Sequence, residues 1–224
     1  MKFFWWCVLG LLVVRTGFGQ SVLRGMVTVD AEPVWVVPPA GDDSAQGGRY
    51  PLSRRDVRLE ALSAAIGYFS GMIYGWEFEY VVGEKARNVE DGFEWRLLGE
   101  LPFGDVRMTP ADSVVEGAIY RLWADYELDA AQSARRGAWT GGQLRVLNAR
   151  GGAGLDEDQQ VAFRVAAQQA VRSLVRGIER ERPKVVRGRI ALAKFPVITI
   201  ADGEWAASAQ FFVEIREIEK YKGY

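Results

Sequence analysis

Acidic residues two positions apart are the first candidates for chemistry in this chain. Glu77 and Glu79, and likewise Asp125 and Glu127, place two carboxylates on the same side of an extended segment. Glycoside hydrolysis uses a pair of carboxyl groups about 5–10 Å apart across a cleft. Residues two apart on a strand come close to that separation from the ~3.3 Å rise alone. Because these acids alternate with apolar residues, we interpret them as the solvent-facing side of a half-buried sheet.

The residues that most other catalytic and metal sites require are missing. The 224-residue chain has no histidine and a single cysteine, Cys7. This excludes serine–histidine–aspartate and cysteine–histidine catalysis, and zinc sites built from histidine or cysteine. The glycines at 151, 152 and 154 lack the spacing of a phosphate-binding loop. The acidic run at 156–158 lacks the pattern of a calcium-binding EF-hand and suits the first turn of a helix. We therefore expect no catalytic residue, no cofactor and no metal site.

The aromatic residues are better candidates for binding. Trp123 lies with Arg121 and Asp125 on the polar side of an expected strand, and Trp139 falls in a glycine-rich segment. An indole beside charged groups offers a large contact area and one hydrogen-bond donor, as in many binding surfaces. We predict that this strand face and the loop carrying Trp139 form a binding surface. The alternative is that a neighbouring loop or strand covers both indoles.

A row of arginines is a second candidate surface. Arg172, Arg176 and Arg180 recur at four-residue steps, and further basic residues follow. Such a row can contact anionic lipid headgroups or the acidic groups of a cell-wall polymer. Glu179 and Glu181 dilute the row, however, and the helix dipole favours basic residues near a helix C-terminus. The formal net charge of -1 gives no reason to expect a nucleic-acid partner.

The N-terminus has the three parts of a secretory signal peptide. Lys2 precedes an uninterrupted apolar run of 12 residues, and Gly17 and Gly19 then supply small residues at the positions that precede a cut. The apolar run is shorter than the ~20 residues that a membrane-spanning helix needs. We therefore expect residues 1–19 to be removed before Gln20. The product would be an exported protein, periplasmic or secreted, that has no cysteine and is not an integral membrane protein.

Two segments have the periodicity of amphipathic helices. One runs from Leu155 to Arg182, with Asp156 in the N-cap position, and the other begins at Ser53 and ends among glycines. Their apolar stripes consist of Phe163, Ala167, Ala170, Val171, Leu174 and Ile178 in the first helix, and Leu59, Leu62, Ile66 and Phe69 in the second. Neither stripe can be buried unless the helix lies on a sheet or on another helix.

The rest of the chain reads mainly as strands and loops. Strand patterns cover residues 22–37, 76–82, 93–97, 120–128, 185–193, 197–201 and 211–215. Loops are expected at 38–50, 101–110 and 130–154; glycines make the last of these the most mobile, with one short strand candidate at 144–147. This order predicts an α+β fold and a single domain over residues 20–224. In it, two amphipathic helices pack on one face of a mainly antiparallel, curved sheet.

These expectations indicate a function without catalysis. We expect an exported envelope protein with a binding or scaffolding role, whose partner is an envelope protein, a cell-wall polymer or a lipid. The alternative is a periplasmic carrier, in which the curved sheet and the two helices enclose a pocket for a small apolar ligand or lipid.

Overall fold

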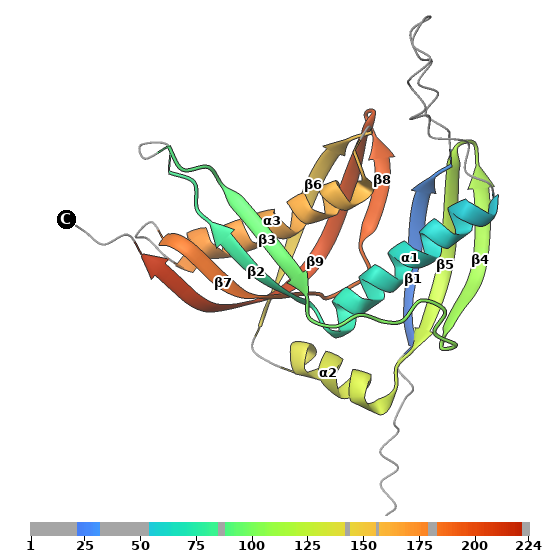
Figure 1. Ribbon diagram of the computed structural model, residues 1–224, viewed down its shortest axis with the longest axis horizontal. Helices are drawn as coiled ribbons and strands as arrows, with labels where there is room; N and C mark the ends of the chain where they lie inside the picture. Colours follow the sequence, from blue (N-terminus) through green and yellow to red (C-terminus); the bar gives the residue numbers. More distant parts are fainter. Residues whose placement is uncertain are drawn as a thin grey trace, which may run out of the picture.

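Three helices and nine strands make up the described part of the chain. The computed structural model describes residues 22–31, 54–84, 88–141, 144–155, 157–178 and 183–220; the expected leader and the loop near 38–50 lie outside them. The elements follow in the order β1 (Val22–Asp30), α1 (Arg54–Ile73), β2 (Trp76–Val81), β3 (Gly92–Leu97), β4 (Met108–Glu116), β5 (Ile119–Glu127), α2 (Ala130–Thr140), β6 (Arg145–Gly154), α3 (Gln159–Ile178), β7 (Pro183–Leu192), β8 (Val197–Ala201) and β9 (Glu204–Lys220) (Figure 1).

The strands form two sheets. In the smaller sheet β5 lies between β1 and β4, and the larger has the order β3–β2–β7–β9–β6, with β8 also paired to β9. The long strand β9 holds the larger sheet together, because it pairs with β6 along one edge and with β8 and then β7 along the other. All of these strand pairs are antiparallel. The predicted α+β class with antiparallel pairing is confirmed. We expected all of the strands in one sheet, and the structure places them in two.

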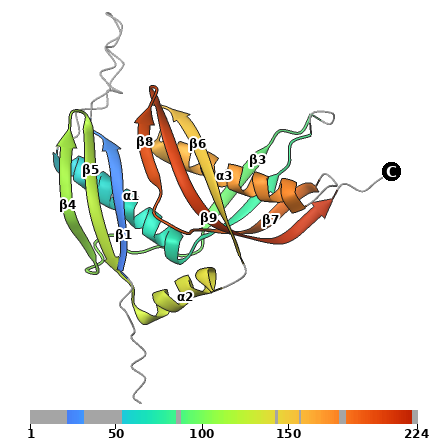
Figure 2. The same cartoon turned by 180° about the vertical axis from the view of Figure 1, so that it is seen from behind.

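The larger sheet curves around α3, while α1 lies across both sheets. The two views show α3 between β2–β3 on one side and β6–β9 on the other (Figure 1, Figure 2). α1 packs on β1 and β5 of the smaller sheet and on β7 of the larger one. None of the helices within the described ranges is both long enough and apolar enough to cross a membrane.

Phe195, in the connection between β7 and β8, joins the two sheets. Its ring makes edge contacts with Tyr68 and Phe69 of α1, at centroid distances of 5.3 and 5.2 Å. It also lies against Gly25 of β1, where a Cβ atom would come within 2.1 Å of the ring. Since real Cβ contacts are never this short, β1 can approach the larger sheet here only because residue 25 is glycine.

The prediction of a loop at 130–154 is wrong, because this segment forms α2 and β6. The short strand candidate at 144–147 falls at the start of β6, which continues to Gly154. Asp129 begins α2 with a capping box: its Oδ1 accepts a hydrogen bond from the Gln132 N–H (2.8 Å), and its own N–H donates to Gln132 Oε1 (3.1 Å). In β6 one glycine, Gly151, allows close packing. A Cβ atom on Gly151 would lie 2.2 Å from the Ala162 carbonyl oxygen, so α3 crosses this strand with almost no space between the backbones.

Two smaller expectations also need correction. β4 begins at Met108, inside the segment expected as a loop, and it tolerates Pro110 because it is an edge strand with a bulge between Pro110 and Asp112. Leu59, expected in the buried stripe of its helix, is 41% exposed. Residue 156 lies outside the described ranges, and at the start of α3 it is Asp158 whose Oδ1 accepts a hydrogen bond from the Gln160 N–H (2.8 Å).

The contact between α3 and β6 leads to a test with a neighbouring control. We expect Gly151→Ala to lower the free energy of unfolding by about 1–3 kcal/mol, because the added methyl group meets helix backbone that cannot move aside. Gly152→Ala should be neutral or raise it by about 0.4–1 kcal/mol, since the nearest atom to its Cβ is 3.6 Å away and the unfolded chain loses entropy. Urea unfolding measures both, and equal effects would contradict the close crossing.

Candidate binding site

The structure brings together three of the four residues predicted to bind. Arg121, Trp123 and Asp125 share the face of β5 opposite to the one that packs on α1, and Trp123 is 37% exposed. On the neighbouring strands, Asp125 forms an ion pair with Arg24 (3.3 Å) and Arg121 forms one with Glu116. These ion pairs are largely solvent-exposed and contribute little to stability. The face is therefore an indole surrounded by paired charges.

Trp139 does not belong to this surface. It lies on α2 rather than in a loop, is only 7% exposed, and packs with Ala191 and Phe212 in a small core cluster under that helix. Its ring also fills the space beside Gly75, where a Cβ atom would come within 2.7 Å of it. The prediction that Trp139 forms an exposed surface with Trp123 is wrong, because α2 turns the indole toward the larger sheet.

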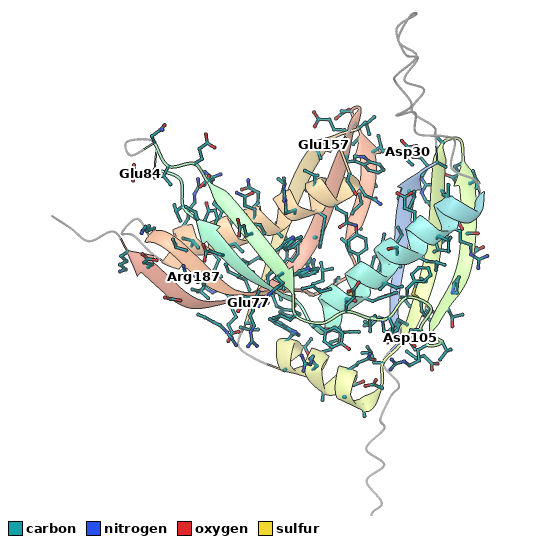
Figure 3. The ribbon with its side chains drawn as sticks, in the orientation of Figure 1. Asp30, Glu77, Glu84, Asp105, Glu157 and Arg187 are labelled. Carbon is teal, nitrogen blue, oxygen red and sulfur yellow. The ribbon has the colours of Figure 1, made fainter. Side chains whose placement is uncertain are left out.

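The paired acids expected on a solvated sheet face are held by arginines. Glu77 accepts a hydrogen bond from Arg96 (2.8 Å), and Glu79 accepts one from Arg187 (2.6 Å). The side-chain view shows Glu77 and Arg187 near each other on the larger sheet, away from α3 (Figure 3). Glu79 raises the pKa of the Arg187 guanidinium above its ordinary value by accepting this hydrogen bond. This arrangement fits the predicted role of the acids as a solvated face.

A polar network surrounds Asp105, at the end of the loop between β3 and β4 (Figure 3). Asp105 Oδ2 accepts hydrogen bonds from Arg107 (2.7 Å) and from the Tyr126 hydroxyl (2.9 Å), and Gln132 donates to that hydroxyl (3.0 Å). Arg107 also forms an ion pair with Asp129 at the start of α2 (2.5 Å). The network thus ties the loop, β5 and α2 together.

Electrostatics in this network favour a structural role. Hydrogen bonding from Arg107 lowers the pKa of Asp105 to about 2, while burial raises the pKa of Tyr126 to about 12. Both groups therefore keep one protonation state near neutral pH. A general acid or base needs a pKa close to the working pH, so these values suit a fixed support better than proton transfer.

An aromatic cavity lies between α1, α3 and the β2–β3 hairpin. It has a volume of about 380 Å³, and its walls are mainly the side chains of Tyr68, Trp76, Trp95, Leu97 and Phe163. Trp76 and Trp95 stack with ring centroids 4.8 Å apart and an interplanar angle of 16°. We call this space the aromatic cleft. Its volume falls within the range of about 300–1,000 Å³ that is usual for small-molecule sites.

Few polar groups border the aromatic cleft. Gln160 donates a hydrogen bond from Nε2 to the Tyr68 hydroxyl (3.2 Å), and burial raises the pKa of Tyr68 above its ordinary value. Arg164, one turn further along α3, also lines the cleft and is exposed. Beyond Gly67 and Gln160 the cleft adjoins a second groove of about 390 Å³, which several carboxylates line. The cleft can enclose an apolar group and leave a polar end at its rim.

Sequence reasoning assigned Trp76 and Trp95 to the core and did not predict a cleft. Their alternation with charged residues correctly placed both rings on the apolar side of their strands. The cleft depends in addition on α1, where Gly67 leaves open space and Gly71 makes room for the Trp76 ring. The pair of small residues one helical turn apart is the signal in the sequence that could have indicated close approach at this point.

Only two arginines of the predicted basic row, Arg172 and Arg176, lie within the ranges that the structure describes. Arg172 pairs with Asp91 (3.4 Å) and Arg176 is exposed, whereas Arg180 lies outside the described ranges. Within the described part of the chain, no three acidic or cysteine side chains gather as they would around a metal ion.

A family model that carries no functional description matches residues 19–221, so the chain belongs to that family. A protein of Treponema pallidum (strain Nichols), named "Uncharacterized protein", is 26% identical over 204 residues, which cover 89% of this chain and 84% of the relative. No solved structure matches the chain.

The Asp105 network predicts a pH-dependent contribution to stability. The pKa of Asp105 is lowered to about 2 in the folded protein. The contribution of Asp105 to the free energy of unfolding is therefore present at neutral pH. It is lost as the pH falls from the ordinary pKa of an aspartate toward 2. We expect Asp105→Asn to lower the free energy of unfolding by about 1.5–3 kcal/mol at pH 7. The deficit should shrink as the pH is lowered from 4 toward 2.

Urea unfolding across this pH range provides the measurement. Asp112→Asn is the matched control, since Asp112 is exposed on β4 and its one hydrogen bond is from the adjacent Ser113 N–H (2.7 Å). The control should stay within about 0.5 kcal/mol of the parent protein. A deficit for Asp105→Asn that is the same at pH 7 and pH 3 would contradict the assigned pKa.

Proposed function

We propose that this member of the family matched over residues 19–221 is an exported, non-catalytic binding protein of the cell envelope that carries a small, largely apolar ligand in the aromatic cleft. The observation that supports this most directly is the stacked pair Trp76–Trp95 in the wall of a cavity of about 380 Å³. Export follows from the leader expected at residues 1–19.

The cleft has the composition of a carrier site. Aromatic and aliphatic walls favour an apolar ligand body at roughly 25 cal/mol for each Å² of apolar surface removed from water. A flat ring or an alkyl chain can lie along Trp95, which is half-buried, while Trp76 and Phe163 beneath it are buried. Phe163 touches Tyr68, Trp76 and Trp95, which fixes these walls relative to one another. A wall that is fixed before binding loses little entropy when the ligand arrives.

A scaffolding role remains the second candidate, and the face of β5 supports it. Trp123 is an exposed indole in the middle strand of the smaller sheet, with Met26 opposite it on β1 and Asp112 opposite it on β4. An aromatic anchor ringed by polar and charged groups is typical of protein contact surfaces. This candidate requires a macromolecular partner, whereas the carrier requires only a small molecule.

Blocking the cleft at Gly67 tests the carrier function. Gly67 lines the cleft, and apart from the adjacent backbone of α1 no heavy atom lies within 4 Å of the position that a Cβ would take. We expect Gly67→Trp to fill the cleft and to remove a ligand that co-purifies with the parent protein. Gly67→Ala should retain the ligand and stabilise α1 by about 0.5–1 kcal/mol.

Native mass spectrometry of protein secreted with its own leader measures both the ligand and the processing. The parent protein should have the mass of a chain that begins at Gln20, plus one ligand. Thermal unfolding of each variant establishes that it is folded. Equal ligand occupancy in the parent protein and in folded Gly67→Trp would refute the cleft as the carrier site.

Replacing Trp123 tests the scaffolding role separately from the carrier function. We expect Trp123→Ala to change the free energy of unfolding little, since the indole is partly exposed, but to abolish binding to a partner in native envelope extract if the β5 face is the contact. Val197→Ala, on the exposed side of β8, is the control and should leave binding unchanged. Binding that survives in Trp123→Ala would exclude this face.

A further inference from the structure

Charge is distributed unevenly around the aromatic cleft. Arg164 is the one cationic side chain that lines it, and the guanidinium has no ion-pair partner among the described residues. By contrast, Arg172, two turns further along α3, is paired with Asp91. An arginine cannot lose its charge in a protein, so the rim of the cleft carries a fixed positive charge that no acidic side chain of the described ranges pairs with.

The opposite end of the cleft is negative. Past Gly67 and Gln160, the carboxylates of Glu100 and Asp158 line the adjoining groove. Because like charges repel, an anionic ligand is disfavoured in that groove and favoured beside Arg164. The aromatic walls between the two ends provide no charged partner. The cleft therefore distinguishes the two ends of an elongated ligand by the sign of their charge.

We propose that the ligand of the aromatic cleft is an anionic amphiphile, with its carboxylate or other acid group at Arg164 and its apolar body on Trp95 and Phe163. This inference rests on the proposed carrier function and specifies its ligand class. The planar guanidinium can hold a carboxylate through two parallel hydrogen bonds. A cationic amphiphile would place its charge against Arg164 or would have to reverse and extend into the acidic groove.

Three probes of nearly equal shape test the charge preference: 4-phenylbutyrate, 4-phenylbutanol and 4-phenylbutylamine. Isothermal titration of the purified protein, after removal of any co-purified ligand, gives the affinity of each. We expect 4-phenylbutyrate to bind about three- to fivefold more tightly than 4-phenylbutanol, as for a solvent-exposed ion pair. 4-Phenylbutylamine should bind most weakly, and the preference should diminish as salt is raised.

Arginine variants assign the preference to one residue. Arg164→Gln should make the affinities of 4-phenylbutyrate and 4-phenylbutanol equal. Arg176→Gln removes an exposed arginine from the last turn of the same helix and should leave the ratio unchanged. If both variants reduce the preference equally, the overall charge of the helix is responsible and the assignment to Arg164 is overturned.

The outcomes separate this inference from the carrier function. Binding of all three probes with equal affinity, abolished by Gly67→Trp, would overturn the anionic ligand and leave the carrier function standing. Tightest binding of 4-phenylbutylamine would overturn the proposed orientation and indicate the acidic groove. Binding of no probe, or binding that folded Gly67→Trp retains, would refute both proposals.

Discussion

The packing of Phe163 against four other aromatic rings is the interaction on which the assembly of α3 with the larger sheet depends. Phe163 is 1% exposed and contacts Tyr68 of α1, Trp76 of β2, Trp95 of β3 and Phe211 of β9. A helix inside a curved sheet must fill the space on every side with side chains, because an unfilled void loses its contacts outright. One large ring in α3 meets this requirement toward three strands and toward the other long helix. All of these rings except that of Phe211 also line the aromatic cleft, so the candidate site is a partly open side of the core.

The second constraint is the close approach of backbones at chosen glycines. Gly25 admits the Phe195 ring between the sheets, Gly71 admits the Trp76 ring against α1, and Gly151 lets α3 cross β6. In each case a single Cβ would come within 2.2 Å of a neighbouring atom. The two sheets, α1 and α3 thus depend on the absence of a side chain at three points in addition to apolar burial.

The sequence predicted most of the fold because the apolar periodicity in α3 and the alternation in β2, β3 and β5 are strong. Phe163, Ala167 and Leu174 are buried as expected, and so is Trp76. Prediction failed where glycine and proline had a structural use other than a turn. Gly151 marks a helix crossing and Pro110 occupies a bulged edge strand, yet both resemble loop residues when composition alone is considered. The sequence also contains the capping-box pair Asp129 and Gln132, a signal for a helix start that we did not use in this glycine-rich segment.

The candidate site was harder to predict than the fold. Trp123, Arg121 and Asp125 share a strand face, so local alternation was sufficient to group them. The aromatic cleft combines residues from α1, the β2–β3 hairpin and α3, whose separation in the chain leaves no periodic signal. Trp139 illustrates the opposite error: an indole among glycines looked exposed, but the helix that carries it packs on Ala191 and Phe212.

Tyr68 gives the molecule a mechanical link between its two halves. The Tyr68 ring makes an edge contact with Phe163 in the aromatic cleft. It makes a second edge contact with Phe195, which lies between the two sheets. In the proposed carrier, a ligand that displaces the Tyr68 ring would therefore also act on Phe195, where the two sheets meet. Binding in the aromatic cleft and the position of one sheet relative to the other would then be coupled through three packed rings, those of Phe163, Tyr68 and Phe195.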